Sequence, residues 1–311
     1  MMTTCLRSGS RALSGNGKLV ATLWAWSTLG ALAAGAATWR WLGAAFNDSP
    51  WADRLLDRFF LGLAAELVQY DRFSPMLALN GAVLGLAAVG LISNPLVAAG
   101  VLEVIVSRDD RPLLHRFFRG AGHFFGRFLR LLVISAVAAV VLVVAAAAIT
   151  RPIATPLSES SWERASIAFG FGRFVVYGAL VAFVMAVLEV ARARVATAAT
   201  ETRGMLRAWL GAARVVLRHI GAVAGIYLAL GVLLVAVLAL YAALAGAIPT
   251  RAWAGIVAAI VLQQLFVMAR AAIRIARAGA TVSLVALTGA RAEGPATVEP
   301  VPSAPSPANV T

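Results

Sequence analysis

The sequence is poor in charged residues, in cysteine and in lysine. Only 13% of its 311 residues are charged and 61% are hydrophobic, and the mean hydropathy is +0.85. A soluble domain has about 25% charged and 45–50% apolar residues. This chain therefore cannot cover itself with a soluble surface, which excludes a soluble enzyme and a disordered chain. The single cysteine, Cys5, excludes an internal disulfide and a multi-cysteine metal site.

Long apolar segments, of which the fourth contains one charged residue, Arg173, instead predict an all-α integral membrane protein. About 20 apolar residues are needed to cross the roughly 30 Å hydrocarbon core as a helix. Six segments meet this condition, at 19–39, between 72 and 103, and at 131–150, 165–188, 220–248 and 252–269. We therefore expect six transmembrane helices in a membrane domain over residues 19–290. An N-terminal tail at 1–18 precedes it, and a disordered tail at 291–311 follows it.

The distribution of basic residues predicts the orientation of these spans. Lys18 is the only lysine among 27 basic residues, and this arginine bias is typical of a GC-rich bacterial genome. Nineteen of the basic residues lie in the two tails and in the second-to-third and fourth-to-fifth connections, against seven on the opposite side. Positive charge marks the cytoplasmic side. We therefore expect a bacterial inner-membrane protein with both termini in the cytoplasm.

The first apolar segment has a second interpretation. Basic residues precede it and small residues at 33–37 end it, as in a cleaved signal peptide. Cleavage would leave five spans and an external N-terminus. The length of the segment, together with its Trp24 and Trp26, favours an uncleaved anchor.

The connections between spans are predicted to form amphipathic helices. Residues 51–70 carry apolar side chains on one helical face and charged ones opposite, and residues 113–130 place phenylalanines between flanking arginines. Each arginine near an anionic leaflet contributes about 1 kcal/mol of attraction. We therefore expect membrane lipids, especially anionic ones, as partners, in contact with Arg116, Arg119, Arg127, Arg130, Arg207, Arg214 and Arg218. Nucleic acid is not expected, because the aromatic residues do not alternate with the arginines on one face.

A short internal similarity predicts a parallel repeat of spans two and three in spans four and five. Val-Leu-Glu-Val occurs at 101–104 and again at 187–190. Downstream, Arg116 and Gly120 align with Arg207 and Gly211 at a constant offset. Both copies have the same orientation, as in parallel transporter repeats. Chance similarity in an alanine- and arginine-rich chain is the alternative.

Six polar or charged residues at membrane depth are candidates for a polar pathway: Asn94, Glu103, Arg173, Glu189, Gln263 and Gln264. Arg192 follows Glu189 by three residues and is its expected partner, whereas Glu103 needs a tertiary partner. Asn94 precedes Pro95, which interrupts the second span or marks the end of its transmembrane part. We favour interfacial ion pairs and interhelical hydrogen bonds for these residues, with a transport pathway as the alternative.

The sequence carries no recognisable catalytic motif. The motifs of zinc proteases, α/β-hydrolases and dinucleotide-binding enzymes do not occur in it. The histidines, His115, His123 and His219, lie among arginines, whose charge disfavours a metal ion. We therefore expect a protein that is not an enzyme, with no catalytic residue, no metal and no cofactor.

Two stretches of the chain resemble a family of bacterial membrane proteins. They include 117–120 and 127–131, then 187–194, 209–218, Tyr227, Tyr241, Gln263, Gln264 and 269–270, and together span most of residues 95 to 285. They resemble an uncharacterised group of six-span inner-membrane proteins, in which Asp-Tyr-Ala-Arg tends to replace the residues from Glu189 to Arg192. The resemblance implies six spans and no known activity. The arrangement is more loosely similar to the membrane domains attached to glycerophosphodiesterases, whose catalytic domain this sequence does not contain.

These observations favour a non-catalytic membrane scaffold or sensor that contacts lipid, as a homo-oligomer or with a partner membrane protein. A small-solute or lipid transporter is one alternative, and it requires the polar residues to converge on one cavity. The permease subunit of an ATP-driven exporter is another, and it requires a separate ATPase chain.

Overall fold

The computed structural model describes residues 1–46, 74–107, 109–159, 163–197, 204–249 and 253–292. These residues form eight α-helices and no strand. The helices are α1 (Met2–Gly15), α2 (Gly17–Phe46), α5 (Ser74–Val106), α6 (Leu113–Glu159), α7 (Glu163–Thr197), α8 (Met205–Arg218), α9 (Ile220–Ala247) and α10 (Trp253–Ala292). The amphipathic helix predicted at 51–70 and the tail from residue 293 onward lie outside the described residues.

Five of the described helices are long and apolar enough to cross a membrane. Their apolar segments are Val89–Val106, Leu113–Pro152, Ile167–Thr197, Ile220–Ala247 and Trp253–Gly289. They correspond to the second through sixth predicted spans, and they support a multi-pass membrane protein. The first predicted span, 19–39, lies in α2, where the side chains at 33, 34 and 37–39 are outside the described residues. A sixth span therefore stays a prediction.

Helix α5 runs through the predicted interruption at Asn94 and Pro95 without a break. Proline removes a backbone N–H and crowds the carbonyl group four residues earlier, which usually kinks or ends a helix. Here the proline ring is fully buried, and Val97, Ala99 and Val101 on the next turns are buried with it. Packing of this segment holds the helix together, so the expectation of a broken span is wrong.

Helix α10 is longer than the predicted sixth span. Its 40 residues reach about 60 Å at 1.5 Å per residue, roughly twice the thickness of the hydrocarbon core. The uncharged part of the helix ends at Arg270, and Arg274 and Arg277 follow on the same unbroken helix. The sixth span and the basic segment that follows it therefore form one continuous helix.

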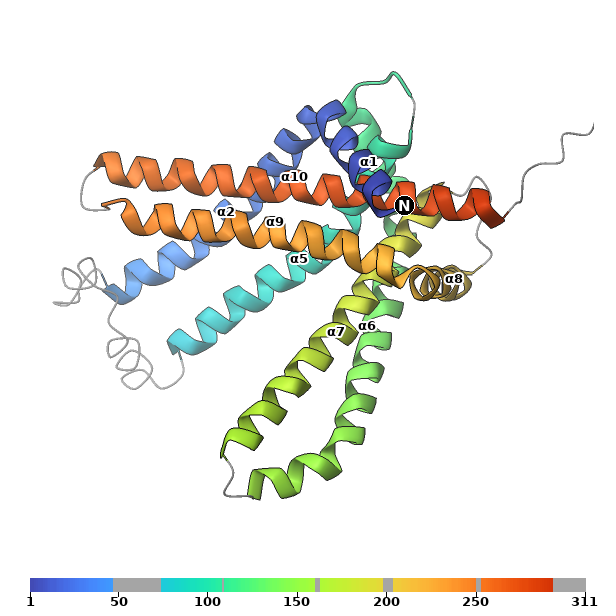
Figure 1. The fold of residues 1–311 in the computed structure, drawn as a ribbon. Coiled ribbons are helices and arrows are strands. Elements are labelled where there is room, and N and C mark those ends of the chain that lie inside the picture. Colours follow the sequence, from blue (N-terminus) through green and yellow to red (C-terminus); the bar gives the residue numbers. More distant parts are fainter. Residues whose placement is uncertain (47–73, 108, 160–162, 198–203, 250–252, 293–311) are drawn as a thin grey trace, which may run out of the picture.

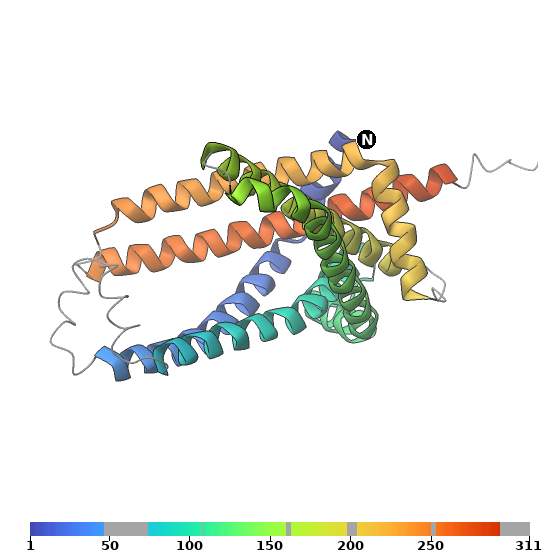
Figure 2. The same cartoon turned by 90° about the horizontal axis from the view of Figure 1, so that it is seen from below.

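The helices converge at one end of the molecule and spread apart toward the other, as Figure 1 and Figure 2 both show. The convergent end, which we call the hub, contains the hydrophobic core. Phe117 and Phe128 of α6, Val187 of α7, Ile226 of α9 and Ile275 of α10 are each at most 2% exposed there. Away from the hub, the long helices carry many exposed apolar side chains, as surfaces that contact lipid do.

The N-terminal segment, expected as a tail, forms helix α1 and packs closely against α10. A methyl group on Gly9 would lie 2.4 Å from the carbonyl oxygen of Ala276, and one on Gly279 would lie 2.7 Å from the Cβ of Ala12. Only glycine lets the two backbones approach this closely. Cys5 is fully buried in the same contact region. Helix α1 therefore belongs to the hub.

The two segments of the proposed repeat share one feature and differ in another. Glu103 and Glu189 are both half-buried, and each lies between fully buried neighbours in its Val-Leu-Glu-Val segment. The basic segment that follows is continuous with the next span in α6, whereas it ends at Arg218 in the second half, where α9 begins separately at Ile220. The repeat stays a prediction.

Candidate functional site

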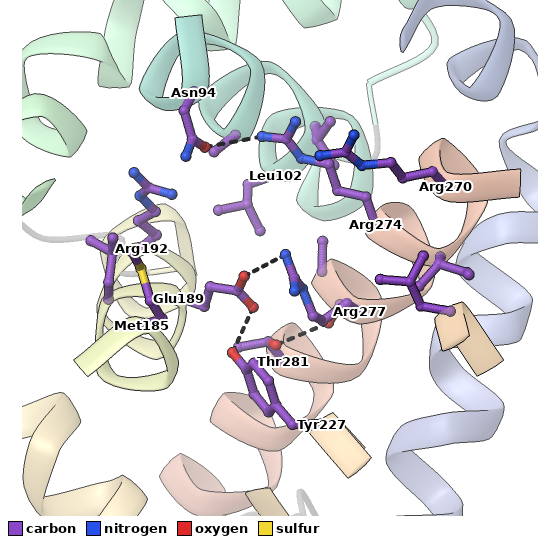
Figure 3. Close-up of a pocket in the computed structure, with 16 residues that line it drawn as sticks. Asn94, Leu102, Met185, Glu189, Arg192, Tyr227, Arg270, Arg274, Arg277 and Thr281 are labelled. Carbon is purple, nitrogen blue, oxygen red and sulfur yellow. Dashed lines mark hydrogen bonds and ion pairs between the residues drawn. The ribbon is translucent and has the colours of Figure 1, made fainter. Parts of the chain in front are cut away.

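A cavity of about 410 Å³ lies between α5, α7, α9 and α10. Four guanidinium groups and one carboxylate face it, as Figure 3 shows. We call it the arginine cavity, and its polar lining is Asn94, Glu189, Arg192, Tyr227, Arg270, Arg274, Arg277 and Thr281. It lies at the depth where the uncharged parts of α7 and α10 end, because Glu189 and Arg270 are the first charged residues after those segments.

Glu189 is bound from two other helices. The hydroxyl group of Tyr227 on α9 donates a hydrogen bond of 2.6 Å to Oε2, and Nη2 of Arg277 on α10 lies 2.8 Å from Oε1. The guanidinium of Arg277 also lies 5.8 Å from the centre of the Tyr227 ring. The three residues therefore connect α7, α9 and α10. The expected partner of Glu189, Arg192, is not the one the structure shows.

Arg192 has almost no contact with solvent and few polar contacts. The residue is 5% exposed, and its guanidinium lies 5.7 Å from the centre of the Phe128 ring on α6. Among the described residues, no hydrogen-bond partner reaches its Nε or Nη2, and both atoms are buried. Arg192 lies three residues after Glu189, so its side chain could turn toward the carboxylate, but it lies over the Phe128 ring instead. Figure 3 shows it at the border of the cavity.

Arg274 contacts the cavity wall that α5 supplies. Its Nη2 donates a hydrogen bond of 3.1 Å to Oδ1 of Asn94. Arg270, one turn earlier on α10, is exposed at the edge of the cavity. Arg270, Arg274 and Arg277 lie three and four residues apart, so they share one face of α10. This spacing is the sequence signal that could have located the cavity.

A second cluster joins the end of α5 to the start of α6. Glu103 finds the tertiary partner that it needs, because Nη2 of Arg119 lies 2.5 Å from its Oε1, while Nη1 lies 3.0 Å from Oδ2 of Asp109. Arg116 donates to the backbone carbonyl groups of Val104, at 2.7 Å, and Ser107. It thereby satisfies carbonyl groups at the C-terminal end of α5. Arg116 and Arg119 therefore have protein partners at this corner, and their contact with lipid stays a prediction.

Asp109 belongs to the segment that connects α5 to α6. Loss of hydration, which by itself raises the pKa of Asp109, is outweighed by other contacts. The backbone N–H and the guanidinium of Arg111, together with the guanidinium of Arg119, hold this pKa below its ordinary value. Asp109 therefore keeps its negative charge beside Arg119 into acidic solution.

The remaining candidates for a polar pathway lie outside the arginine cavity. The side-chain oxygen of Gln264 accepts hydrogen bonds from the indole N–H of Trp24 at 2.8 Å and from Thr28 at 3.2 Å, which join α10 to α2. Arg173 donates to the hydroxyl group of Tyr177 at 3.0 Å on its own helix. Gln263 is exposed. Only Asn94 and Glu189 of the six candidates line the arginine cavity.

Helix α8 lies roughly perpendicular to α9 and α10. It is seen nearly end-on in Figure 1, where those helices run in the plane of the view, and Figure 2 shows it crossing their direction. Ala212 and Val216 bury its inner face, and the indole N–H of Trp209 donates a 2.9 Å hydrogen bond to the hydroxyl group of Ser135. Its outer face exposes arginines and leucines together, namely Leu206, Arg207, Leu210, Arg214, Leu217 and Arg218.

The structure offers no metal site among the residues it describes. No group of three or more histidine, cysteine, aspartate or glutamate side chains occurs there. No family model matches the chain, and no curated protein and no solved structure matches it. A functional assignment therefore has to come from α8 and the arginine cavity.

Proposed function

We propose that the protein is a non-catalytic membrane scaffold or sensor that holds anionic phospholipid at the cytoplasmic face of a bacterial inner membrane. The observation that carries this proposal is the orientation of α8. If α9 and α10 cross the bilayer, a helix perpendicular to them lies parallel to the membrane plane. At 14 residues, or about 21 Å, α8 is also too short to span the hydrocarbon core.

The outer face of α8 has the chemistry of a helix that lies in the headgroup layer. Leu206, Leu210 and Leu217 are each more than half exposed, and such side chains enter the boundary between headgroups and acyl chains. The aliphatic part of an arginine side chain lies along the same apolar layer, while its guanidinium extends to the phosphates. Three arginines contribute about 3 kcal/mol of attraction to an anionic leaflet, which is roughly a hundredfold in the binding equilibrium of the helix with that surface.

The start of α6 supplies two more candidate arginines. Arg130 is exposed and Arg127 is half-buried, so both remain candidates for lipid contact. Arg116 and Arg119, which have protein partners, do not support the proposal. The lipid-contacting surface is thus Arg127, Arg130, Arg207, Arg214 and Arg218.

The test is native mass spectrometry of the protein purified in mild detergent. We expect the triple variant Arg207→Gln/Arg214→Gln/Arg218→Gln to lose most of the co-purified phosphatidylglycerol and cardiolipin. The matched control is the triple lysine variant at the same positions, which keeps the charge and should retain these lipids. Equal retention by the glutamine variant and the wild type would overturn the proposal.

Transport of a small anionic solute is a second candidate, because the arginine cavity brings Asn94 and Glu189 together with four arginines. Glu103, Arg173 and Gln264, however, have partners elsewhere. The measurement is uptake of radiolabelled phosphate by proteoliposomes. Uptake above that of protein-free liposomes, lost in Arg274→Gln, would place transport first.

A further inference from the structure

The arginine cavity contains more positive charge than its described lining neutralises. Arg192, Arg270, Arg274 and Arg277 face it, and Glu189 is the one carboxylate in its lining. That carboxylate already binds Arg277 at 2.8 Å. Among the described residues, the hydrogen-bond partner of Arg274 is the neutral amide of Asn94. Three guanidinium groups therefore share a small volume without a matching negative charge from the lining.

Among these arginines, Arg192 is buried and, within the part of the chain that the structure describes, lacks hydrogen-bond partners for two of its nitrogens. Arg192 is only 5% exposed, yet its Nε and Nη2 have no hydrogen-bond partner among the described residues. Buried polar groups in native proteins almost always have partners, and a buried unpaired charge is strongly destabilising. The stacking on Phe128 compensates only part of this cost. An exogenous anion in the cavity would place a negative charge beside this guanidinium and thereby offset the cost of burying it.

The shape and chemistry of the cavity specify the kind of anion. Guanidinium groups from two helices, Arg192 on α7 and Arg270 and Arg274 on α10, approach the same space from different sides (Figure 3). The planar donor fork of arginine matches the oxygens of a phosphate group. A volume of about 410 Å³ falls in the range of small-molecule sites and leaves room for a substituent on the phosphate. Leu102, Met185 and Ile273 supply an apolar wall for it.

We propose that the arginine cavity binds the phosphate group of a phosphorylated ligand, with Arg192, Arg270 and Arg274 holding its oxygens. The ligand is a phospholipid headgroup or a soluble phosphate ester, which share this chemistry. The depth of the cavity, where the uncharged segments of α7 and α10 end, is that of headgroup phosphates. The proposal goes beyond the lipid-contacting surface of α8, since no residue of α8 lines the cavity.

The experiment measures binding of two probes to the full-length protein in detergent by isothermal titration calorimetry. The probes are inorganic phosphate and dihexanoylphosphatidylglycerol, a soluble short-chain lipid. We expect Arg192→Gln to weaken binding by about ten- to a hundredfold, the loss of a charge-assisted hydrogen-bonding group. Arg11→Gln on α1 is the matched control, because it removes the same charge from an exposed site that belongs neither to the cavity lining nor to the lipid-contacting surface, and it should bind as the wild type does.

Each outcome decides the proposal. Saturable binding of dihexanoylphosphatidylglycerol alone assigns the site to a lipid headgroup, and binding of phosphate as well assigns it to soluble phosphate esters too. Wild type that binds neither probe, or Arg192→Gln that binds as tightly as wild type, overturns the proposal. Should Arg192→Gln fail to fold, Arg270→Gln at the exposed edge takes its place with the same expectation. Lipid retention by the triple glutamine variant of α8 tests the lipid-contacting surface, whereas probe binding by Arg192→Gln tests the cavity. Either proposal can therefore be refuted without the other.

Discussion

Replacement of Gly120 by alanine tests whether the close crossing of α5 and α6 sets the geometry of the hub. A Cβ at this position would lie 2.2 Å from the Cβ of Glu103 and 3.1 Å from the carbonyl oxygen of Ala99. Ordinary carbon–carbon contact is about 3.5–4.0 Å, so the helices would have to separate by more than about 1 Å. The Cβ of Glu103 is fixed to the backbone, and no change of rotamer relieves the clash. Overpacking of this kind costs about 1–3 kcal/mol.

Gly122, two residues later on the same helix, is the matched control. A Cβ there meets nothing within 4 Å, so Gly122→Ala has only the gain of about 1 kcal/mol from the higher helix propensity of alanine. The same gain occurs in Gly120→Ala, and the difference between the two variants therefore isolates the clash. We expect Gly120→Ala to be less stable than Gly122→Ala by about 1–3 kcal/mol.

Equilibrium unfolding in detergent micelles, followed by circular dichroism, measures this difference. A rise in the protease sensitivity of the connection between α5 and α6 should accompany the loss of stability. Equal stability of Gly120→Ala and Gly122→Ala would refute the reasoning, because it would mean that α5 and α6 do not cross closely at Glu103.

Three further substitutions test other contacts by the same unfolding measurement. Gln264→Leu should destabilise the protein by about 1 kcal/mol, since it leaves the indole N–H of Trp24 without its acceptor; an unchanged midpoint would contradict that contact. Tyr227→Phe should cost about 1–3 kcal/mol by removing the 2.6 Å donor to Glu189, and a stability equal to wild type would show that Arg277 alone satisfies the carboxylate. The pKa of Asp109 is lowered in the folded protein, so its charge should stabilise the fold. The difference in free energy of unfolding between wild type and Asp109→Asn should be fully present above pH 3.8, the ordinary pKa of the group. It should be lost as the pH falls through the lower pKa of the folded state. A difference that is already lost above pH 3.8 would contradict the ion pairs of Asp109.

The sequence predicted the class of the fold and most of its spans because hydrophobic length is a local property. Five of the six predicted spans coincide with long apolar helices of the structure. Backbone hydrogen bonds must be satisfied within each span in lipid, and a continuous apolar run therefore specifies a helix without reference to its neighbours. The same local rule failed at Pro95, where burial of the ring in α5 outweighs the helix-breaking tendency of the residue.

The site depended on contacts between helices that are distant in the sequence. The sequence identified Glu103 and Glu189 as the acidic residues needing explanation, and it proposed Arg192 as the partner of Glu189 from their spacing of three residues. The structure pairs Glu189 with Tyr227 and Arg277 instead, because the packing of α10 against both α7 and α9 brings those groups nearer than the turn of α7 brings Arg192.

The sequence by itself determined an all-helical membrane protein with arginine-rich segments next to its spans, because composition and hydrophobic periodicity are properties of each segment. Tertiary structure alone decided which arginines have partners. The crossing of α5 and α6 brings Arg119 within ion-pair distance of Glu103. The packing of α7 on α6 places Arg192 over Phe128. The transverse orientation of α8 leaves Arg214 exposed. The physical reason is that the state of a charge is set by what other helices bring within a few ångströms, and no spacing along one helix contains that information.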